Sequence, residues 1–323
     1  MTILVCGEAL YDVFQAGEPV PGQLALDGRY GGSALNTAIG IARQGARVSL
    51  FTGLSLDMLG QRLLARIKAE GVGQQHLVFS GRPTTISLVG QDAGGNPSYT
   101  FYGLGSADTG LTEADIPAMD ETVDALHLGS YACVVTPVGG AMLALAERYA
   151  DRFISYDPNT RPTVEPDMRR WRARVDRFRQ LASMIKVSTE DLSALYPGCS
   201  PLEVARDWAQ VEPLRLLVLT DGPNDLTAWF KGKELRARPP PVAVADTVGA
   251  GDTVQAALLA AFAKAGAFQD RLGGVAIAEM QAYLERAVVA AAITCSRRGA
   301  DMPTLYQLSV TGTPCTGAKF VIG

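Results

Sequence analysis

Short apolar runs alternate with stretches of helical period along most of this chain. The apolar runs that predict strands lie at residues 3–6, 48–52, 126–129, 153–156, 183–187 and 215–219. Each is followed by a stretch of helical spacing. Strands that alternate with helices pair in parallel, so the pattern predicts an α/β fold whose mostly parallel sheet carries helices on both faces. Right-handed connections then gather ligand-binding residues at the carboxyl ends of the strands.

The composition favours an ordered globular enzyme, because 47% of the 323 residues are apolar and only 19% are charged. A net charge of −4 argues against a nucleic-acid partner, which would need a basic face. The five cysteines form no CxxC pair, which indicates reduced thiols and a cytoplasmic location. The most apolar helical stretches, 254–263 and 287–295, are too short to span a membrane.

Two segments interrupt the alternation of strands and helices. Residues 13–30 carry prolines and glycines between hydrophobic residues, and residues 84–103 alternate in period two. Both are predicted to be strands of a small antiparallel sheet inserted into the α/β domain. Such a sheet would close over the ends of the main strands as a lid that excludes water, and an ordinary surface hairpin is the alternative.

A run of small residues at Gly249, Ala250 and Gly251 precedes a stretch with a helical apolar face. Small side chains let backbone N–H groups approach an anion closely. The dipole at the start of the following helix adds attraction for phosphate. The chain contains no Gly-x-x-x-x-Gly-Lys-Ser/Thr run, so this is not a P-loop of that type.

Asp252 directly follows these small residues. A carboxylate in this place is commonly a helix cap or first-turn residue. Beside a phosphate it would repel the ligand, unless it takes a proton from an attacking hydroxyl. The sequence therefore leaves two interpretations of Asp252, a structural one and a catalytic one.

A second group of polar residues and glycines lies near the N-terminus. Asp12 follows the first predicted strand and could accept hydrogen bonds from two neighbouring sugar hydroxyls. Gly31 and Gly32 permit close backbone approach, and Asn36 offers both a donor and an acceptor. The alternatives are a surface acid at Asp12 and a helix that starts at Ser33. Convergence of these features on one end of a cleft favours a sugar site.

Together these residues resemble the ribokinase-like (PfkB) carbohydrate kinase family, and most closely its fructokinase branch. The resemblance extends from Gly7 to about Leu305 and rests on two signatures. The first is Gly31-Gly32-x-x-x-Asn36-x-Ala38, and the second is Asp246-Thr-Val-Gly-Ala-Gly-Asp252. Asp157-Pro-Asn-x-Arg161 resembles a further motif of the sugar kinases.

The resemblance implies a role for each matching residue. Asp252 would be the general base, and the backbone N–H groups of residues 249–251 would form an anion hole for the transferred phosphoryl group. The residues that would hold the sugar are Asp12, Gly31, Gly32, Asn36 and Arg161.

The resemblance also implies a nucleotide and metal side of the site. Thr220 and Gly222 resemble the nucleotide-binding turn of the family. Ser188, Glu190 and Asp191 resemble an Asn-x-x-Glu element that helps to organise Mg²⁺ and phosphate, and a capping box at a helix start is the alternative. A monovalent cation, K⁺, beside the second signature would involve Asp246.

Three positions depart from the pattern of the family: Val254, Val288 and Gly103. The first two change the expected nucleotide pocket. The third replaces an arginine that would bind a carboxylate, so a neutral sugar is favoured.

We therefore predict a ribokinase-like three-layer fold with a mostly parallel central sheet and a small inserted β-sheet lid. The kinase domain comprises residues 1–12, 31–83 and 104–309, the lid comprises 13–30 and 84–103, and 310–323 form a tail outside the resemblance. The predicted reaction is ATP- and Mg²⁺-dependent phosphorylation of a sugar hydroxyl, with fructose to fructose 6-phosphate as the first choice. A homodimer formed through the lid, with no nucleic-acid or membrane partner, is expected.

Other activities remain open at this point. Within the family they are ribokinase, nucleoside kinase and 2-keto-3-deoxygluconate kinase activities. Outside it, a non-catalytic sugar or nucleotide sensor on the same fold is the main alternative. A Rossmann-type dehydrogenase is disfavoured, because no Gly-x-Gly-x-x-Gly turn follows the first strand.

Overall fold

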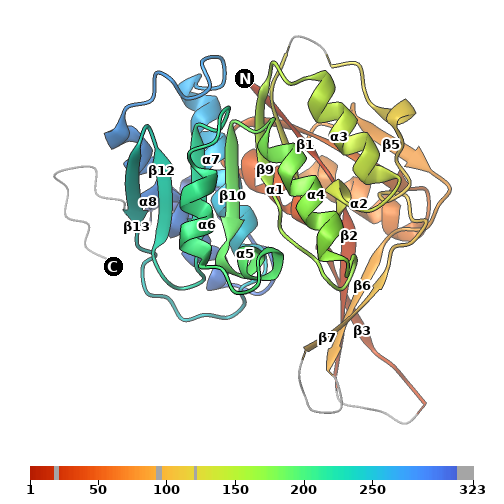
Figure 1. Cartoon of the computed structure of the whole chain (residues 1–323). Helices are drawn as coiled ribbons and strands as arrows, with labels where there is room; N and C mark the ends of the chain where they lie inside the picture. The colour runs from red at the N-terminus through yellow and green to blue at the C-terminus, as the bar shows by residue number, and fades with distance from the viewer. Residues whose placement is uncertain (18–21, 92–96, 120–121, 311–323) are drawn as a thin grey trace.

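A large sheet forms the centre of the molecule (Figure 1). The computed structural model describes residues 1–17, 22–91, 97–119 and 122–310. Within them, the nine strands of this sheet follow the order β13 (Lys233–Ala237), β12 (Leu226–Phe230), β11 (Leu216–Thr220), β10 (Met184–Ser188), β9 (Phe153–Asp157), β8 (Val123–Gly129), β1 (Thr2–Cys6), β4 (Arg47–Ser55) and β5 (Leu77–Ser80). Neighbours from β11 to β5 pair in parallel, which confirms the predicted parallel sheet.

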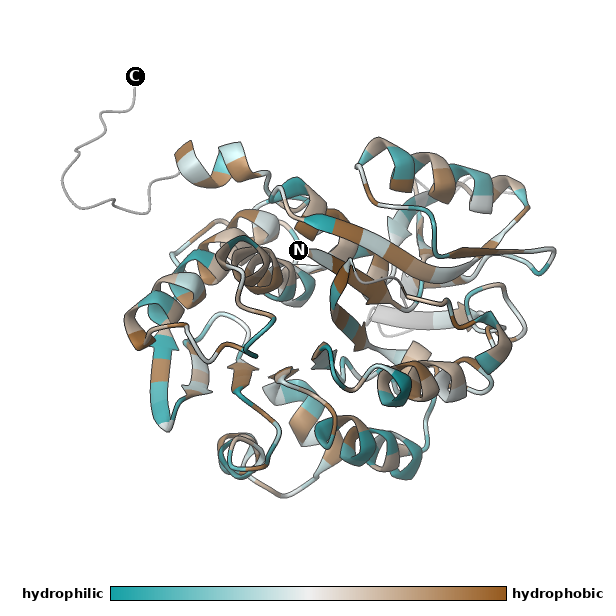
Figure 2. Cartoon of the chain, turned by 90° about the horizontal axis from the view of Figure 1, so that it is seen from above, coloured by the Kyte–Doolittle hydropathy of each residue, from teal (hydrophilic) through white to brown (hydrophobic). Residues whose placement is uncertain are grey.

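Helices cover both faces of this sheet and give three layers. One face packs against α1 (Ser33–Arg43), α2 (Met58–Ala69), α7 (Ala250–Ala265), α8 (Ile277–Cys295) and α9 (Leu305–Val310). The other face packs against α3 (Val138–Arg148), α4 (Met168–Arg179), α5 (Thr189–Leu195) and α6 (Pro201–Trp208). Side chains along β1 alternate between the two cores, with Ile3 in one and Leu4 in the other. Figure 2 shows hydrophobic residues along the strands at the centre of the molecule.

One expectation about the connections is wrong. The strand predicted at 215–219 is β11, but it is followed by two antiparallel strands instead of a helix. Lys231 and Gly232 have φ values of 48° and 71° and join β12 to β13 in a tight hairpin. Paired positive φ angles suit the right-handed twist of a two-residue hairpin, and periodicity alone did not reveal this turn.

A second, four-stranded sheet extends away from the main body, at the bottom of Figure 1. Its order is β3 (Leu26–Gly31), β2 (Leu10–Gln15), β6 (Ile86–Gln91) and β7 (Pro97–Tyr102). The β2–β6 pair is parallel and the outer pairs are antiparallel. Asp12 therefore lies within a strand of the small sheet rather than in a loop after β1. The division of the chain into a kinase domain and a lid stays a prediction.

Two short features complete the described chain. Two 3₁₀ helices span Glu113–Asp115 and Tyr131–Cys133. None of the helices in the described ranges combines the length and the apolar character needed to cross a membrane. Of the predicted tail, residues 311–323 lie outside the described residues.

Candidate active site

The start of α7 forms the first part of the candidate site. Gly249 precedes the helix in the left-handed conformation, with φ of 78°. A Cβ at this glycine would lie 2.5 Å from Cβ of Ala300, so a larger residue would collide with its neighbour. The N–H of Ala250 donates to the carbonyl of Thr247 at 3.2 Å. The N–H of Ala250 is one of the three predicted to bind an anion, and it is already hydrogen-bonded in the structure.

Asp252 lies in the first turn of α7 and is almost completely buried. Its Oδ1 accepts a hydrogen bond from the Ser33 hydroxyl at 2.7 Å, and its Oδ2 accepts one from the Asn36 amide at 2.9 Å. Ser33 and Asn36 belong to the first turn of α1. The two signatures therefore meet through direct contacts between residues more than 200 positions apart in the chain.

The two glycines before α1 make room for acidic residues. A Cβ at Gly31 would lie 2.2 Å from Oδ2 of Asp12. Gly32 has φ of 101°, and a Cβ there would lie 2.7 Å from the carbonyl oxygen of Glu8. These close approaches give a physical reason for the paired glycines.

Asp12 is half-buried on β2 and its carboxylate is close enough to Asp252 for their charges to interact. Burial raises the pKa of Asp12, and the charge of Asp252 acts in the same direction. The Ser87 hydroxyl and the Arg161 guanidinium oppose this rise. Two carboxylates, Asp12 and Asp252, thus face the same region of the structure.

Arg161 reaches this region from the segment that follows β9. Its guanidinium donates to the carbonyl oxygens of Asn159 at 3.2 Å and Thr160 at 2.9 Å. Its positive charge lowers the pKa of both Asp12 and Glu8 against the effect of burial. The structure therefore brings together Asp12 and Arg161, the two charged residues that the sequence placed at the sugar end.

Glu8 is a member of this group that the sequence analysis missed. It is 2% exposed, and its Oε1 accepts the N–H of Ser33 at 3.0 Å. Burial raises the pKa of Glu8 to about 7, although the Ser33 amide and the charge of Arg161 favour its ionised form. An acid directly after a buried strand was the signal that could have found it.

The segment at the start of α5 has the geometry of a capping box. Asp191 accepts from the hydroxyl and the N–H of Ser188 at 2.7 Å and 3.1 Å. Its other oxygen accepts from the N–H of Thr160 at 2.7 Å and its hydroxyl at 2.9 Å. Glu190 is exposed. The four hydrogen bonds to Asp191 fit the structural alternative, and a metal-related role of Glu190 and Asp191 stays a prediction.

Thr220 and Gly222 lie in the turn at the end of β11. Gly222 has φ of 52°, and a Cβ added there would meet no atom within 4 Å. Between them, Asp221 accepts a hydrogen bond from the Thr189 hydroxyl at 2.7 Å. This contact places the turn beside the start of α5.

Asp246 stabilises the loop that leads to Gly249 through hydrogen bonds to its carboxylate. Its Oδ1 accepts the N–H of Val248 at 3.0 Å, and its Oδ2 accepts the N–H of Gly299 at 2.9 Å. The N–H groups of Ala245 and Asp246 both donate to the carbonyl of Cys295. These bonds tie the loop to the end of α8.

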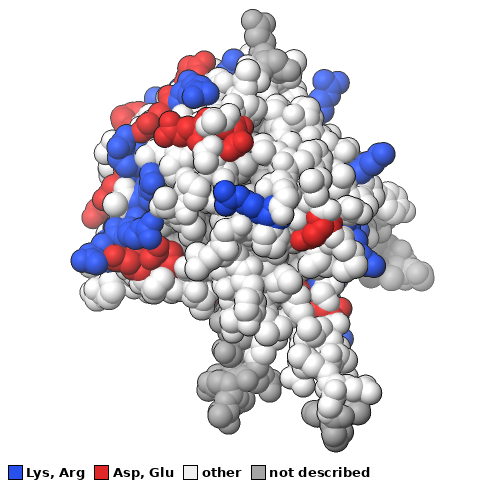
Figure 3. Space-filling model, turned by 90° about the vertical axis from the view of Figure 1, so that its right-hand side faces the viewer, with Lys and Arg blue, Asp and Glu red and all other residues white. Residues whose placement is uncertain are grey.

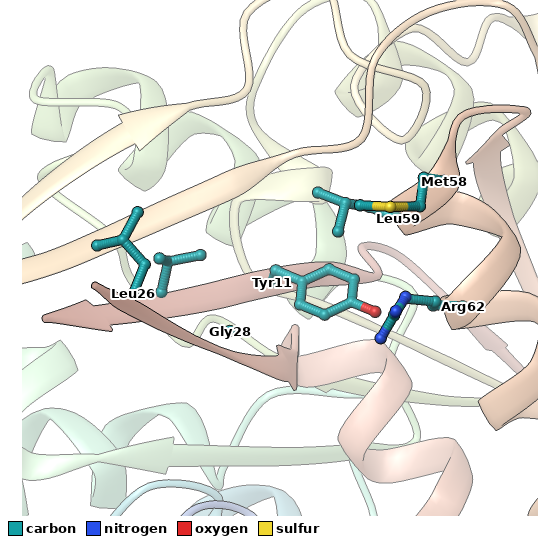
Figure 4. A pocket seen from close by; sticks show the side chains of 7 residues that line it. Tyr11, Leu26, Gly28, Met58, Leu59 and Arg62 are labelled. Carbon is teal, nitrogen blue, oxygen red and sulfur yellow. The ribbon is translucent and has the colours of Figure 1, made fainter. Parts of the chain in front are cut away.

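A pocket of about 260 Å³ lies on the other face of β2 (Figure 4). Its lining consists of Tyr11, Val13, Leu26, Gly28, Met58, Leu59 and Arg62. Side chains alternate along a strand, so Tyr11 and Val13 point away from the face that carries Asp12. The pocket between the small sheet and α2 is therefore separate from the candidate active site.

Comparison with known proteins identifies similar chains. A model of the pfkB family carbohydrate kinases matches residues 2–305. A fructokinase from Rhizobium leguminosarum bv. trifolii is 35% identical over 259 residues, which cover 80% of this chain and 78% of that protein. A fructokinase from Salmonella typhimurium is 30% identical over 312 residues, or 94% of this chain and 96% of that protein.

Solved structures show the same architecture. A fructokinase with bound ATP from Xylella fastidiosa superimposes with a TM-score of 0.86 at 24% identity, over 96% of this chain and 97% of that one. A fructokinase double mutant from Vibrio cholerae O395, in a form with fructose, ADP and potassium ion bound, gives a TM-score of 0.77 at 25% identity. That match covers 95% of this chain and 94% of the other. The predicted family resemblance and three-layer fold are confirmed.

The buried carboxyl of Glu8 generates a prediction about pH and stability. Its pKa rises from 4.5 to about 7 on folding, so between these values the folded chain holds a proton that the unfolded chain releases. This contribution to stability is present below pH 4.5 and is lost as the pH rises through 7. The stability of Glu8→Gln relative to the parent should therefore increase across this window, by up to about 3 kcal/mol.

Urea denaturation of both proteins at about pH 5 and about pH 8 measures this difference. Glu212→Gln, at an exposed surface glutamate paired with Arg215, is the control and should leave the difference constant. A stability difference between Glu8→Gln and the parent that is the same at both pH values would contradict the prediction.

Proposed function

Because the chain belongs to the pfkB family of carbohydrate kinases, we propose that it transfers the γ-phosphoryl group of ATP to fructose, giving fructose 6-phosphate and ADP. The observation that carries this proposal is the contact of Asp252, at the start of α7, with Ser33 and Asn36 of α1. This contact joins a phosphate-binding helix terminus to the glycine-rich segment beside Asp12. The reaction needs ATP, which fits a cytoplasmic enzyme.

In the proposed mechanism Asp252 takes the proton of the attacking sugar hydroxyl. The oxygen of that hydroxyl forms a bond to the γ-phosphorus, while the bond from phosphorus to the leaving oxygen of ADP breaks. Each carboxylate oxygen of Asp252 accepts one hydrogen bond and can accept a second one, from the sugar hydroxyl. The N–H groups of Gly249 and Gly251 would stabilise charge on the phosphoryl oxygens, and Ala250 would join them if its bond to Thr247 opens.

Asp12, Asn36 and Arg161 are proposed to orient the sugar, with Gly31 and Gly32 providing room. A neutral sugar is favoured by the surroundings of Gly103. A Cβ at this position would lie 2.3 Å from the ring of Phe101, so an arginine there would displace that ring. The described strands β6 and β7 contain no lysine, arginine or histidine that could bind a carboxylate instead.

The nucleotide is proposed to lie along the turn of Thr220 and Gly222. A magnesium ion bound with ATP would neutralise charge on the phosphates. Among the described residues, no three His, Cys, Asp or Glu side chains are grouped to hold a metal ion, which fits an ion held mainly by phosphate and water. Exposed Glu190 would approach such water, whereas Asp191 would act indirectly, by holding Ser188 and Thr160 in place.

The assigned base is tested by Asp252→Asn, which keeps the size of the side chain and removes the proton acceptor. We expect kcat for fructose to fall by roughly 10²–10⁴-fold, with a much smaller change in KM. Coupled release of ADP measures both, with ribose, tagatose, 2-keto-3-deoxygluconate and adenosine as competing substrates. Asp225→Asn, at a surface ion pair with Arg238, is the matched control and should keep the parent rate.

Each outcome separates one alternative. Turnover of another substrate that depends on Asp252 would keep the mechanism and change the substrate. Binding of ATP without turnover of any sugar would favour the sensor. An Asp252→Asn variant with the parent kcat would show that Asp252 is not the general base.

We also propose a monovalent cation beside the 246–249 loop, where Asp246 joins this loop to Gly299. The potassium ion in the Vibrio cholerae relative supports this assignment. A cation there would act by stabilising the loop next to the amides of Gly249 and Gly251. We expect kcat to be several-fold higher in potassium chloride than in tetramethylammonium chloride at equal ionic strength. Equal rates in the two salts would remove the cation from the proposal.

The outer face of the small sheet supports the proposed homodimer. Exposed apolar side chains gather there and on the adjoining start of α2, namely Leu26, Tyr30, Leu56 and Met58. In Figure 3 the lower part of the molecule carries few charged side chains. A solvent-exposed apolar face of this kind is typical of a surface that another protein covers.

The homodimer predicts sedimentation at twice the chain mass of 34.2 kDa at micromolar concentration. Leu26→Glu should shift the protein toward the monomer, because a charge would be buried in the interface. Val211→Glu, at an exposed apolar residue away from the small sheet, should leave the mass unchanged. A parent protein that sediments only as a monomer would contradict the proposal.

A further inference from the structure

Lys186 is a buried cation directly beneath the start of α7. It lies on β10 and is 3% exposed. A Cβ added to Gly251 would lie 3.2 Å from its Nζ, so the ammonium is next to the backbone proposed to bind phosphate. A lysine inside the apolar run at 183–187 was a signal in the sequence that the analysis left unused.

The position of this charge needs an explanation. A helix start attracts anions and disfavours cations, and removal of an ammonium from water is costly. Lys186 forms an ion pair with Asp157, at 2.8 Å between Nζ and Oδ2, and both side chains are almost fully buried. Burial disfavours the charged ammonium, but the carboxylates of Asp157, Asp191 and Asp252 outweigh it and raise the pKa of Lys186.

The ion pair has unused hydrogen-bonding capacity on both sides. An ammonium has three N–H donors, and among the described residues only Asp157 forms an ion pair with this one. On the carboxylate, Oδ1 of Asp157 is buried without a hydrogen-bond partner among the described residues. A buried ion pair kept only for stability is expected to have its remaining groups satisfied. The free donors of Lys186 therefore suit a ligand that arrives at the anion loop.

The negative charges of three acidic residues, Asp157, Asp191 and Asp252, act on this ammonium, and Asp157 is in direct contact with it. The γ-phosphoryl group of a nucleoside triphosphate adds further negative charge at the same place. Without a cation in contact, the negatively charged phosphoryl group would be repelled by the Asp252 carboxylate at short range. Lys186 supplies such a cation, because its ammonium lies next to Gly251 and interacts with the charge of Asp252.

Building on the function proposed above, we propose that Lys186 donates a hydrogen bond to the γ-phosphoryl group of bound ATP and keeps this hydrogen bond while the group is transferred to the sugar. The ammonium keeps one N–H on Asp157, which fixes its position, and directs another past Gly251 to a phosphoryl oxygen. No proton is transferred by Lys186, and the proton of the sugar hydroxyl still goes to Asp252. A purely structural ion pair is the alternative.

The test uses a double variant, Lys186→Met with Asp157→Asn, that replaces both charges by neutral side chains of similar size. Neutral replacement of a complete buried pair often preserves stability, whereas removal of one partner leaves an unpaired charge. Lys264→Met, an exposed lysine on the same helix as Asp252, is the control. Thermal denaturation checks that each protein folds.

Two measurements separate the proposal from a structural role. We expect kcat to fall by roughly 10²–10³-fold, with KM for the sugar changed by less than about threefold, as for loss of one preorganised donor. Without sugar, affinity for ATP should fall about tenfold while affinity for ADP stays constant, because ADP lacks the contacted group. A folded double variant with the parent kcat and the parent ratio of ATP to ADP affinity would overturn the proposal.

The two readouts also distinguish this inference from the proposed function. If the parent protein phosphorylates none of the sugars, the proposed function fails, and calorimetric titration with ATP and ADP still decides whether Lys186 contacts the γ-phosphoryl group. If the parent is an active kinase and the double variant keeps both parent values, only the role of Lys186 fails.

Discussion

The candidate site depends on the hydrogen bonds that Asp252 receives from Ser33 and Asn36. They join the first turns of α1 and α7, two helices that pack on the same face of the main sheet. Each helix begins after a glycine with positive φ, a conformation that other residues adopt only with strain. The carboxylate is thus held at a helix terminus, where the surrounding dipoles favour negative charge. The same field attracts phosphate, so the start of α7 would position both the proposed base and the phosphoryl group that is transferred.

Much of the fold could be predicted from sequence because its physical cause is local. Apolar runs such as 48–52 and 153–156 become buried strands whichever partners they find, and parallel order follows from the helices between them. The hairpin of β12 and β13 escaped prediction, because it depends on a two-residue turn at Lys231 and Gly232 within otherwise ordinary sequence. Periodicity describes which faces are buried, and it does not describe how a short turn reverses the chain.

The site was predicted in part for a similar reason. Glycine runs and an adjacent acid mark Gly249–Asp252 and Gly31–Asn36, because such spacings are rare outside anion and sugar sites. Glu8 and Lys186 belong to no such spacing. Glu8 follows a strand and Lys186 lies within one, so the sequence gives only a weak signal for each, and their contacts in three dimensions show what the charges do. The position of Asp191 shows the converse case, in which a motif fits a capping box as well as it fits a ligand site.

Asp12 has a consequence that follows from the sheet to which it belongs. It is carried by β2 of the small sheet, whereas Asp252 is fixed to a helix of the main body. Any displacement of the small sheet therefore changes the distance between the residue proposed to recognise the sugar and the residue proposed to activate it. Recognition and shielding from solvent would then be one event rather than two. Water, which is too small to contact Asp12 and Asp252 together as the proposed sugar would, would not stabilise a closed position of the sheet and would therefore compete poorly for the phosphoryl group.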